Sequence, residues 1–332
     1  MGTKRLGIGI IGSSMIAHRF ADAARKSGLC SPVAVYSRSE ASGRAFADVE
    51  GDLAVVCDFD AFLALSSVDA VYVASPNALH YRQAKAAIEA GKHVLCEKPL
   101  TSTFAEYLDL AEAAERRGVV LMEAMRPLHD PAFALICESI GALGQIRRVD
   151  LEYCQYSSRY DAFLAGTVQN AFLPSLSNAA LMDIGVYPIA LLVALFGLPE
   201  YVRSASVFLE NGFEGAGEML CRYSDFLASV SYSKITDSVA PSVITGENGS
   251  LTVDRINAPS RLTLALRGKP ETQLSYTPIE NNMVYEAIDF CRAVRGEIDP
   301  SRFSDFSEKT MRMLDLVRAQ NGIVFPCDVK NR

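Results

Sequence analysis

The feature that most constrains the fold of this chain is the regular alternation of short apolar runs with helical stretches in its N-terminal part. Apolar runs at 6–11, 32–36, 70–74 and 93–96 are separated by segments whose apolar residues recur every three or four positions. Strands that alternate with helices predict a parallel, doubly wound sheet. We therefore expect an α/β domain of the Rossmann type over residues 1–125.

The first apolar run ends in a turn of small residues that leads into a helical pattern. Gly12, Ser14 and Ala17 occupy the positions of the G-x-G-x-x-G/A pattern, with serine in place of the middle glycine. Such a turn lets the backbone approach a pyrophosphate, and the following helix presents N–H groups to it. A plain tight turn explains the pattern equally well, so the motif alone leaves both interpretations open.

Charged residues end two of these runs. Glu97, Lys98 and Pro99 follow the fourth run directly, and ligands of open α/β proteins bind at the C-terminal edge of the sheet, so we expect Lys98 to face a cleft. Pro99 excludes the α-helical region for Lys98, and an X-Pro bond can be cis at modest cost. Ser37 and Arg38 follow the second run, where an NAD enzyme would place an acid, which favours NADP(H) unless Arg38 points to solvent.

The order of these motifs suggests a family. The runs Ser75-Pro76-Asn77, Ala90-Gly91-Lys92-His93 and Cys96-Glu97-Lys98-Pro99-Leu100 follow one another, with Asp183 and Tyr187 in the second half. This series resembles the Gfo/Idh/MocA family of NAD(P)-dependent oxidoreductases. The Asp and Tyr pair is similar to the branch that contains glucose-fructose oxidoreductase and dimeric dihydrodiol dehydrogenase.

The residues after 125 predict a second domain of the α+β class. Strand-like alternation predicts an antiparallel open sheet formed by the segments 146–157, 202–210, 217–223, 226–235, 243–253 and 261–266. Two late helical patterns, at 283–294 and 307–319, are expected to pack on this sheet or back on the first domain. The chain thus divides into a dinucleotide-binding domain at 1–125 and a substrate-binding and dimerisation domain at 126–332.

The chemistry of hydride transfer points to particular side chains. A carbinol carbon that loses a hydride must also lose its hydroxyl proton to a nearby group. Tyr187 is the candidate, and a cation such as Lys98 would favour its phenolate form. Asp183 lies four residues earlier and would oppose that ionisation, so we assign it to orienting Lys98 or a substrate hydroxyl. By spacing alone, such a pair is more often an acid near a helix start and a half-buried aromatic, and the family resemblance is what favours the functional interpretation.

The resemblance also implies cofactor and substrate contacts. The expected cofactor residues are Gly12, Ser13, Ser14, Met15, Ile16, Ser37, Arg38, Ser75, Pro76, Asn77, His80, Glu97 and Lys98. Arg126, Arg159 and Tyr160 are candidates for holding substrate hydroxyls, although a solvated surface position explains each equally well. The four histidines lack metal-ligand spacing, so no metal is expected.

Composition restricts the partners of the chain. The net charge of −7, with no block of Lys or Arg, argues against a nucleic-acid surface. Eight widely spaced cysteines without C-x-x-C suit reduced thiols in a cytoplasm. The first apolar stretch is too short and too rich in glycine for a signal peptide, and the run 189–196 is too short to span a bilayer, so no membrane partner is expected.

We therefore expect an NAD(P)-dependent oxidoreductase that acts on a CH–OH group of a sugar or cyclic polyol, with NADP(H) preferred and NAD(H) possible. The alternatives are a non-catalytic NADP-binding sensor of the same fold and a dehydrogenase of non-sugar cyclic diols. The presence of both Lys98 and Tyr187 favours the enzyme. Relatives dimerise through an open sheet face, so a homodimer or homotetramer is expected. The residues proposed for that face, unless they form the domain core, are Val230, Tyr232, Leu262 and Leu264.

Overall fold

The computed structural model describes residues 5–330, except for the side chains of residues 329 and 330. Their internal contacts divide the chain into two units. The first comprises the residues up to Ala124 together with Glu280–Glu308, and the second comprises Met125–Ile279 together with the residues from Lys309 onward. The segment 280–308 thus belongs to the first unit although it follows the second-domain sheet in the sequence. The domain boundary at residues 125 and 126 remains our proposal.

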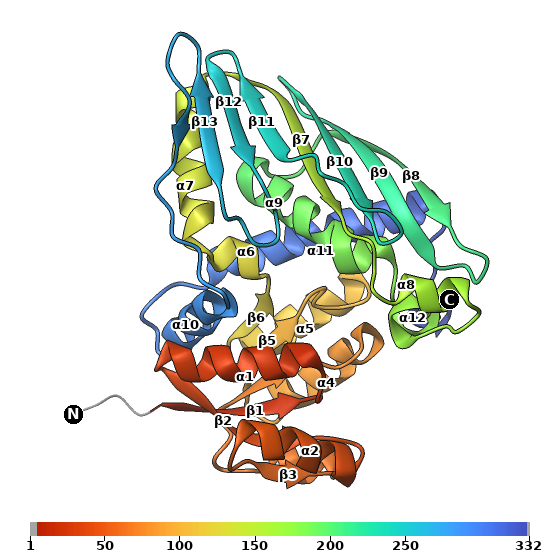
Figure 1. The fold of residues 1–332 in the computed structure, drawn as a ribbon. Coiled ribbons are helices and arrows are strands. Elements are labelled where there is room, and N and C mark those ends of the chain that lie inside the picture. The colour runs from red at the N-terminus through yellow and green to blue at the C-terminus, as the bar shows by residue number, and fades with distance from the viewer. Residues whose placement is uncertain (1–4, 331–332) are drawn as a thin grey trace. The chain divides into compact units, whose positions relative to one another are not determined.

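The first unit is built on a six-stranded parallel sheet with the order β3-β2-β1-β4-β5-β6 (Figure 1). Its strands are β1 (Leu6–Ile11), β2 (Cys30–Tyr36), β3 (Ala54–Val56), β4 (Ala70–Val73), β5 (His93–Glu97) and β6 (Leu121–Ala124). The predicted doubly wound sheet is confirmed. The strand order reverses between β1 and β4, and this reversal is where open α/β sheets form their binding crevice.

Helices connect these strands and cover the sheet. The connecting helices are α1 (Met15–Ser27), α2 (Glu40–Glu50), α3 (Phe59–Leu63), α4 (Asn77–Glu89) and α5 (Phe104–Arg117), and α10 (Met283–Val294), from later in the chain, packs against α1. The Phe20 ring of α1 stacks on the Tyr72 ring of β4 with centroids 3.7 Å apart, in a core to which Met283 and Phe290 of α10 also contribute. Helix α11 (Ser301–Asn321) begins six residues before the predicted start at 307, because Asp299 accepts a hydrogen bond from the Ser301 N–H and supports an earlier first turn.

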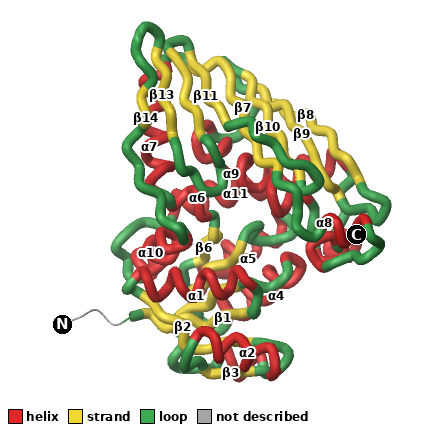
Figure 2. The backbone as a smooth tube through the Cα atoms, in the orientation of Figure 1, coloured by secondary structure: helices red, strands yellow, loops and turns green. Residues whose placement is uncertain are grey.

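The second unit contains an eight-stranded sheet with the order β14-β13-β12-β11-β7-β10-β9-β8 (Figure 2). Its strands are β7 (Ile146–Cys154), β8 (Tyr201–Phe208), β9 (Glu214–Arg222), β10 (Leu227–Ser233), β11 (Ser242–Gly246), β12 (Gly249–Val253), β13 (Leu262–Leu266) and β14 (Thr272–Gln273). The expected antiparallel open sheet is confirmed: all neighbouring strands pair antiparallel except β7 and β10, which pair in parallel. The helical connection after β7 makes β8 run in the direction of β7, and two hairpins later β10 runs in that direction too.

Helices α7 and α9 pack on one face of this sheet (Figure 1). The helices of the second unit are α6 (Arg126–His129), α7 (Pro131–Ile140), α8 (Tyr160–Leu164), α9 (Val186–Phe196) and α12 (Pro326–Lys330), with 3₁₀ turns at Gly141–Leu143, Asn170–Phe172 and Pro174–Leu176. The helical run Pro174–Phe196 is long and apolar enough to cross a membrane, but most of its apolar part is buried inside the structure. That burial is typical of a core helix.

The two faces of the sheet carry different side chains. Val230, Tyr232 and Leu262 are at most 1% exposed and Leu264 is half-buried, so three of the four residues proposed for an open face belong to the core instead. Side chains alternate along a strand, and these three lie on the face that packs against helices. The opposite face exposes the apolar side chains of Tyr201, Val207, Leu220 and Leu227.

Candidate active site

A cavity of about 340 Å³ opens at the C-terminal ends of β1, β2 and β4. Its lining includes seven residues that the sequence predicted for the cofactor: Gly12, Ser13, Ser14, Ser37, Arg38, Ser75 and Pro76. It also includes residues that the sequence analysis missed: Ile11, Tyr36, Ser39, Ser42, Ala74, Leu79 and Gln83. Ser39 and Ser42 follow Ser37 and Arg38 in a serine-rich segment directly after β2, and that composition was the available signal. Predicted cofactor residues outside this lining are Met15, Ile16, Asn77, His80, Glu97 and Lys98.

The glycine turn at one end of this cavity has no room for a side chain. Gly12 has φ +107°, and a Cβ atom there would lie 2.7 Å from the Ala74 carbonyl oxygen. Ser14 precedes α1 in an extended conformation, and its side chain makes no capping hydrogen bond. A backbone that can be approached closely, followed by the N-terminus of a 13-residue helix, fits the pyrophosphate of a dinucleotide.

The other end of the cavity is polar and carries a cation. Arg38 is exposed, Ser37 is nearly buried, and the Ser39 hydroxyl accepts a hydrogen bond from the Ser42 N–H at the start of α2. None of the lining residues, all of which lie in the described chain, is acidic. A guanidinium beside serine hydroxyls suits a phosphate better than a free ribose hydroxyl.

The turn that carries Lys98 is held by buried side chains. The Lys98–Pro99 peptide is cis, a geometry that the sequence allowed. The Lys98 N–H donates to Glu97 Oε2 at 3.2 Å, the Pro99 carbonyl oxygen lies 2.9 Å from His80 Nδ1, and the Leu100 N–H donates to Glu123 Oε1 at 2.9 Å. Three successive residues of the turn are therefore each fixed through a backbone group.

His80 and Glu97 act as supports behind this turn. His80 Nε2 lies 2.8 Å from the Ser75 carbonyl oxygen, so the ring joins the loop after β4 to the loop after β5. Burial lowers the pKa of His80, and a neutral ring donates to only one of the two carbonyls at a time. Glu97 accepts a 2.5 Å hydrogen bond from the Tyr72 hydroxyl, whose pKa is raised by burial and by the Glu97 charge.

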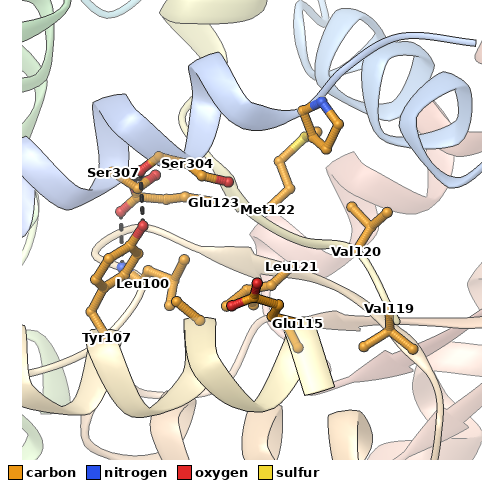
Figure 3. A pocket seen from close by; sticks show the side chains of 13 residues that line it. Leu100, Tyr107, Glu115, Val119, Val120, Leu121, Met122, Glu123, Ser304 and Ser307 are labelled. Carbon is orange, nitrogen blue, oxygen red and sulfur yellow. Dashed lines mark hydrogen bonds between the residues drawn. The ribbon is translucent and has the colours of Figure 1, made fainter. Parts of the chain in front are cut away.

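A second cavity of about 220 Å³ lies among α5, β6 and the start of α11 (Figure 3). Glu123 lines it, donors from Leu100 and Ser307 reach its two carboxylate oxygens, and Tyr107 donates to the Ser304 carbonyl oxygen at 2.8 Å. Burial raises the pKa of Glu123 to about 7. This cavity shares no lining residue with the cofactor cavity.

In the second unit the structure brings Tyr187 and Arg126 together. The side chain of Tyr187, on α9, is 7% exposed, and its hydroxyl lies 3.5 Å from Arg126 Nη2. The Arg126 guanidinium lies 5.8 Å from the centre of the Tyr187 ring, and Tyr153 packs edge-on against that ring with centroids 5.5 Å apart. Two residues that the sequence assigned to catalysis and to substrate binding are thus neighbours.

Asp183 forms an ion pair that the sequence analysis missed. Lys234 Nζ donates to Asp183 Oδ2 at 2.5 Å, with 5% of the Lys234 side chain and 43% of the Asp183 side chain exposed. Asp183 lies in a π-helical turn, Leu181–Gly185, before α9, so it does not continue the regular α-helix that the spacing suggested. Lys234 directly follows β10, and a cation at a strand end was the signal that had identified Lys98.

The remaining predicted substrate residues lie near the start of α8. Tyr160 packs against Phe163 and Phe172, with ring centroids 6.0 and 5.8 Å away, and Arg159 is exposed. Lys234 Nζ lies 5.3 Å from the centre of the same Phe172 ring. Tyr160 and Lys234 therefore contact one aromatic cluster.

The chain is similar to characterised proteins along nearly its whole length. It is 40% identical over 321 residues to scyllo-inositol 2-dehydrogenase (NADP(+)) IolU of Bacillus subtilis, covering 96% of this chain and 98% of that protein. It is 28% identical to trans-1,2-dihydrobenzene-1,2-diol dehydrogenase of Danio rerio, covering 96% of this chain and 98% of the relative.

The fold is also found among solved structures. The 3-ketoreductase KijD10 of Actinomadura kijaniata, in complex with NADP and TDP-benzene, superposes with a TM-score of 0.85 at 24% identity, covering 96% of this chain and 98% of that one. Residues 6–125 match the oxidoreductase family with a NAD-binding Rossmann fold, and residues 139–252 match the GFO/IDH/MocA C-terminal domain. The expected family is confirmed: this chain is a member of the GFO/IDH/MocA oxidoreductases.

Proposed function

We propose that this oxidoreductase transfers a hydride between NADP(H) and a CH–OH or carbonyl carbon of a cyclic polyol or a sugar. The observation that carries the proposal is the cofactor cavity, which combines the Gly12 turn and the start of α1 with a cationic end at Arg38. When bound, the nicotinamide supplies or accepts the hydride. NADP(H) is the preferred cofactor, in agreement with the NADP(+) dependence in the name of the Bacillus subtilis relative.

Tyr187 passes the proton in this proposal. Its phenol is nearly buried, and its hydroxyl lies 3.5 Å from Arg126 Nη2, so the guanidinium can hold this hydroxyl in position to exchange a proton with a substrate hydroxyl. Lys98, on the turn after β5, supplies a second positive charge to the reacting oxygen. Asp183, held by Lys234, accepts a hydrogen bond from another substrate hydroxyl.

The proposed substrate is a cyclic polyol first and a sugar second, because the 40% identical relative is a scyllo-inositol dehydrogenase. A non-sugar cyclic diol is the alternative, favoured by the likeness to a dihydrobenzenediol dehydrogenase. The non-enzymatic alternative is a sensor protein that binds the cofactor without turning over a substrate. We place the protein in the cytoplasm, since all eight cysteines are free thiols, which suits a reducing compartment.

Turnover of a substrate panel, compared between the parent and two variants, tests the proposal. Inositols, aldoses and cyclic diols are screened by absorbance of the reduced nicotinamide. Tyr187→Phe should bind NADPH like the parent and lose kcat by about 10²–10⁴-fold, the usual size of an acid–base contribution. Lys98→Met should lose at least as much, and the double variant should lose no more than the larger single loss, because groups that act as a unit are not additive.

Two outcomes would contradict this assignment. A Tyr187→Phe enzyme that keeps about a third or more of the parent kcat removes the proton-transfer role, because that loss is far below an acid–base effect. A parent protein that binds NADPH tightly but turns over no polyol, sugar or diol favours the sensor. Tyr153→Phe is the matched control, because that ring packs against Tyr187 and has no assigned proton role.

A further inference from the structure

Glu123 is a buried carboxylate that ties two segments of the first unit together. It lies in β6 opposite Cys96 of β5, and it is 4% exposed. Its Oε1 accepts from the Leu100 N–H at 2.9 Å, and its Oε2 accepts from the Ser307 hydroxyl at 2.9 Å (Figure 3). Both carboxylate oxygens are therefore engaged, one by the turn after β5 and one by α11.

A buried carboxylate at this position destabilises the fold relative to an apolar side chain. Taking an ionised group out of water costs several kcal/mol, whereas a well-packed apolar side chain of similar size would cost little. This unfavourable desolvation indicates that the carboxylate has a specific role. Glu123 accepts the hydrogen bond from the N–H of Leu100, two residues after Lys98. Pro99 has no N–H, so among residues 98–100 the backbone offers only two N–H donors, and carboxylates satisfy both.

We propose that ionised Glu123 is a positioning residue for Lys98, acting through the Leu100 N–H to hold the turn in the geometry that the reaction needs. The inference rests on the proposed function, because it assumes that Lys98 acts in turnover. Without this acceptor the buried Leu100 N–H lacks its partner, and the turn must shift to find another. A displacement of about 1 Å at a reacting group can cost about 10²-fold in rate.

The charge of Glu123 can change near neutral pH. Burial raises its pKa to about 7, while the bonds from Ser307 and Leu100 and the Lys98 cation favour the ionised form. Other ionisable groups near it are Glu97, which raises its pKa, Cys96 and Tyr107, whose own pKa values its charge raises, and Glu115, which lines the same cavity. Because it lines the cavity of Figure 3, which is large enough for water, its carboxyl group can exchange protons with solvent.

The test compares three variants of the full-length enzyme. Glu123→Ala removes the acceptor and should lower kcat by about ten- to a hundredfold, with NADPH affinity and substrate KM within about threefold of the parent. Glu123→Gln keeps a neutral oxygen acceptor and should retain kcat within about threefold at high pH, because a neutral bond is weaker than a charged one but still holds the turn. Ser307→Ala is the matched control, since it removes the other bond to the same carboxylate and should leave kcat unchanged at high pH, where Glu123 is ionised with or without that bond.

The pH profile separates positioning from mere packing. The parent kcat should rise through about pH 7 as Glu123 ionises, and Glu123→Gln should lack this inflection. The proposal is overturned if Glu123→Ala keeps kcat within about threefold, if Ser307→Ala loses as much as Glu123→Ala, or if Glu123→Gln retains the inflection. If Glu123→Ala does not fold, the pH profile of Glu123→Gln alone tests the role of Glu123. Lys98→Met separates a failure of the proposed function from a failure of this inference. A fully active Lys98→Met variant refutes the proposed function. An inactive Lys98→Met variant together with an active Glu123→Ala variant refutes only the role of Glu123.

Discussion

Arg38 places a positive charge at the end of the cofactor cavity where many NAD enzymes use an acid. The side chain is exposed, and its neighbours in the cavity are the hydroxyls of Ser37, Ser39 and Ser42. A charge-assisted hydrogen bond to a phosphate contributes about 1.5–3 kcal/mol. That free energy corresponds to a preference for NADPH over NADH of about ten- to a hundredfold.

Removing this charge should abolish most of the preference. In Arg38→Gln we expect NADPH to bind about ten- to a hundredfold more weakly, while NADH affinity changes little because NADH has no 2′-phosphate. Titration of both cofactors at one ionic strength measures the effect. Arg44→Gln is the control, because Arg44 lies on α2, outside the cavity lining, and pairs with Glu40. Equal or tighter binding of NADH than of NADPH by the parent would refute the assignment.

At the scale of elements, the adjacent ends of β5 and β6 bring two acids into the first unit, Glu97 and Glu123, both buried. For Glu123 the folded-state pKa lies near 7, against an ordinary value of 4.5, and burial is the main cause. Between these pH values the folded protein holds a proton that the unfolded chain has released. This group therefore contributes stability that is fully present below about pH 4.5 and is lost as pH rises through about 7.

The predicted consequence is a pH-dependent difference between the parent and Glu123→Gln. At about 1.4 kcal/mol per pKa unit, the free energy of unfolding of the parent should fall by roughly 3 kcal/mol relative to the variant between pH 4.5 and 8. Melting temperatures of both proteins at pH 5, 6, 7 and 8 measure this, since the other titrating groups are common to both. Parallel curves for the two proteins would show that Glu123 keeps an ordinary pKa.

The helix that carries Tyr187 begins differently from what the local sequence pattern predicted. The spacing of Asp183 and Tyr187 suggested one regular helix, but the chain forms a π-helical turn before α9. Gly185 at the end of that turn packs on Tyr232 so closely that a Cβ atom would lie 2.9 Å from the Tyr232 ring. The sequence shows the glycine but not the ring of β10 that faces it.

At the scale of the whole molecule, the eight-stranded sheet has an apolar patch on the face away from α7 and α9. Tyr201, Leu220 and Leu227 are 42%, 49% and 49% exposed, and they lie on the neighbouring strands β8, β9 and β10. Within the described residues, no helix of the second unit covers this patch (Figure 1). An exposed apolar face of this kind is typical of a self-association surface.

We expect a homodimer or homotetramer that forms through this patch, in place of the residues first proposed. The double substitution Leu220→Glu and Leu227→Glu should lower the mass measured by light scattering at micromolar concentration, because it buries carboxylates in the interface. Leu108→Glu is the control, since Leu108 is 47% exposed on α5 of the first unit. A parent protein that already has the mass of a monomer would refute the expectation.

The sequence by itself determined the features that depend on neighbours along the chain. Alternating runs predicted the parallel sheet, Gly12 marked a turn where a side chain does not fit, and Lys98-Pro99 marked a strand end that carries a cation. Each of these follows from periodicity or backbone sterics within a few residues. The motif series was sufficient to identify the family, and the family-model matches confirm it.

Only the tertiary structure decided which distant side chains meet. Lys234 reaches Asp183 across 51 residues, Ser307 reaches Glu123 across 184, and the register of β10 turns Val230 and Tyr232 inward and leaves Leu227 outside. A shift of one residue in a strand exchanges its two faces, so burial depends on pairing partners that no local pattern specifies. The supports of Lys98 and Asp183 are therefore products of strand order and register, whereas the residues they support were recognisable from the chain alone.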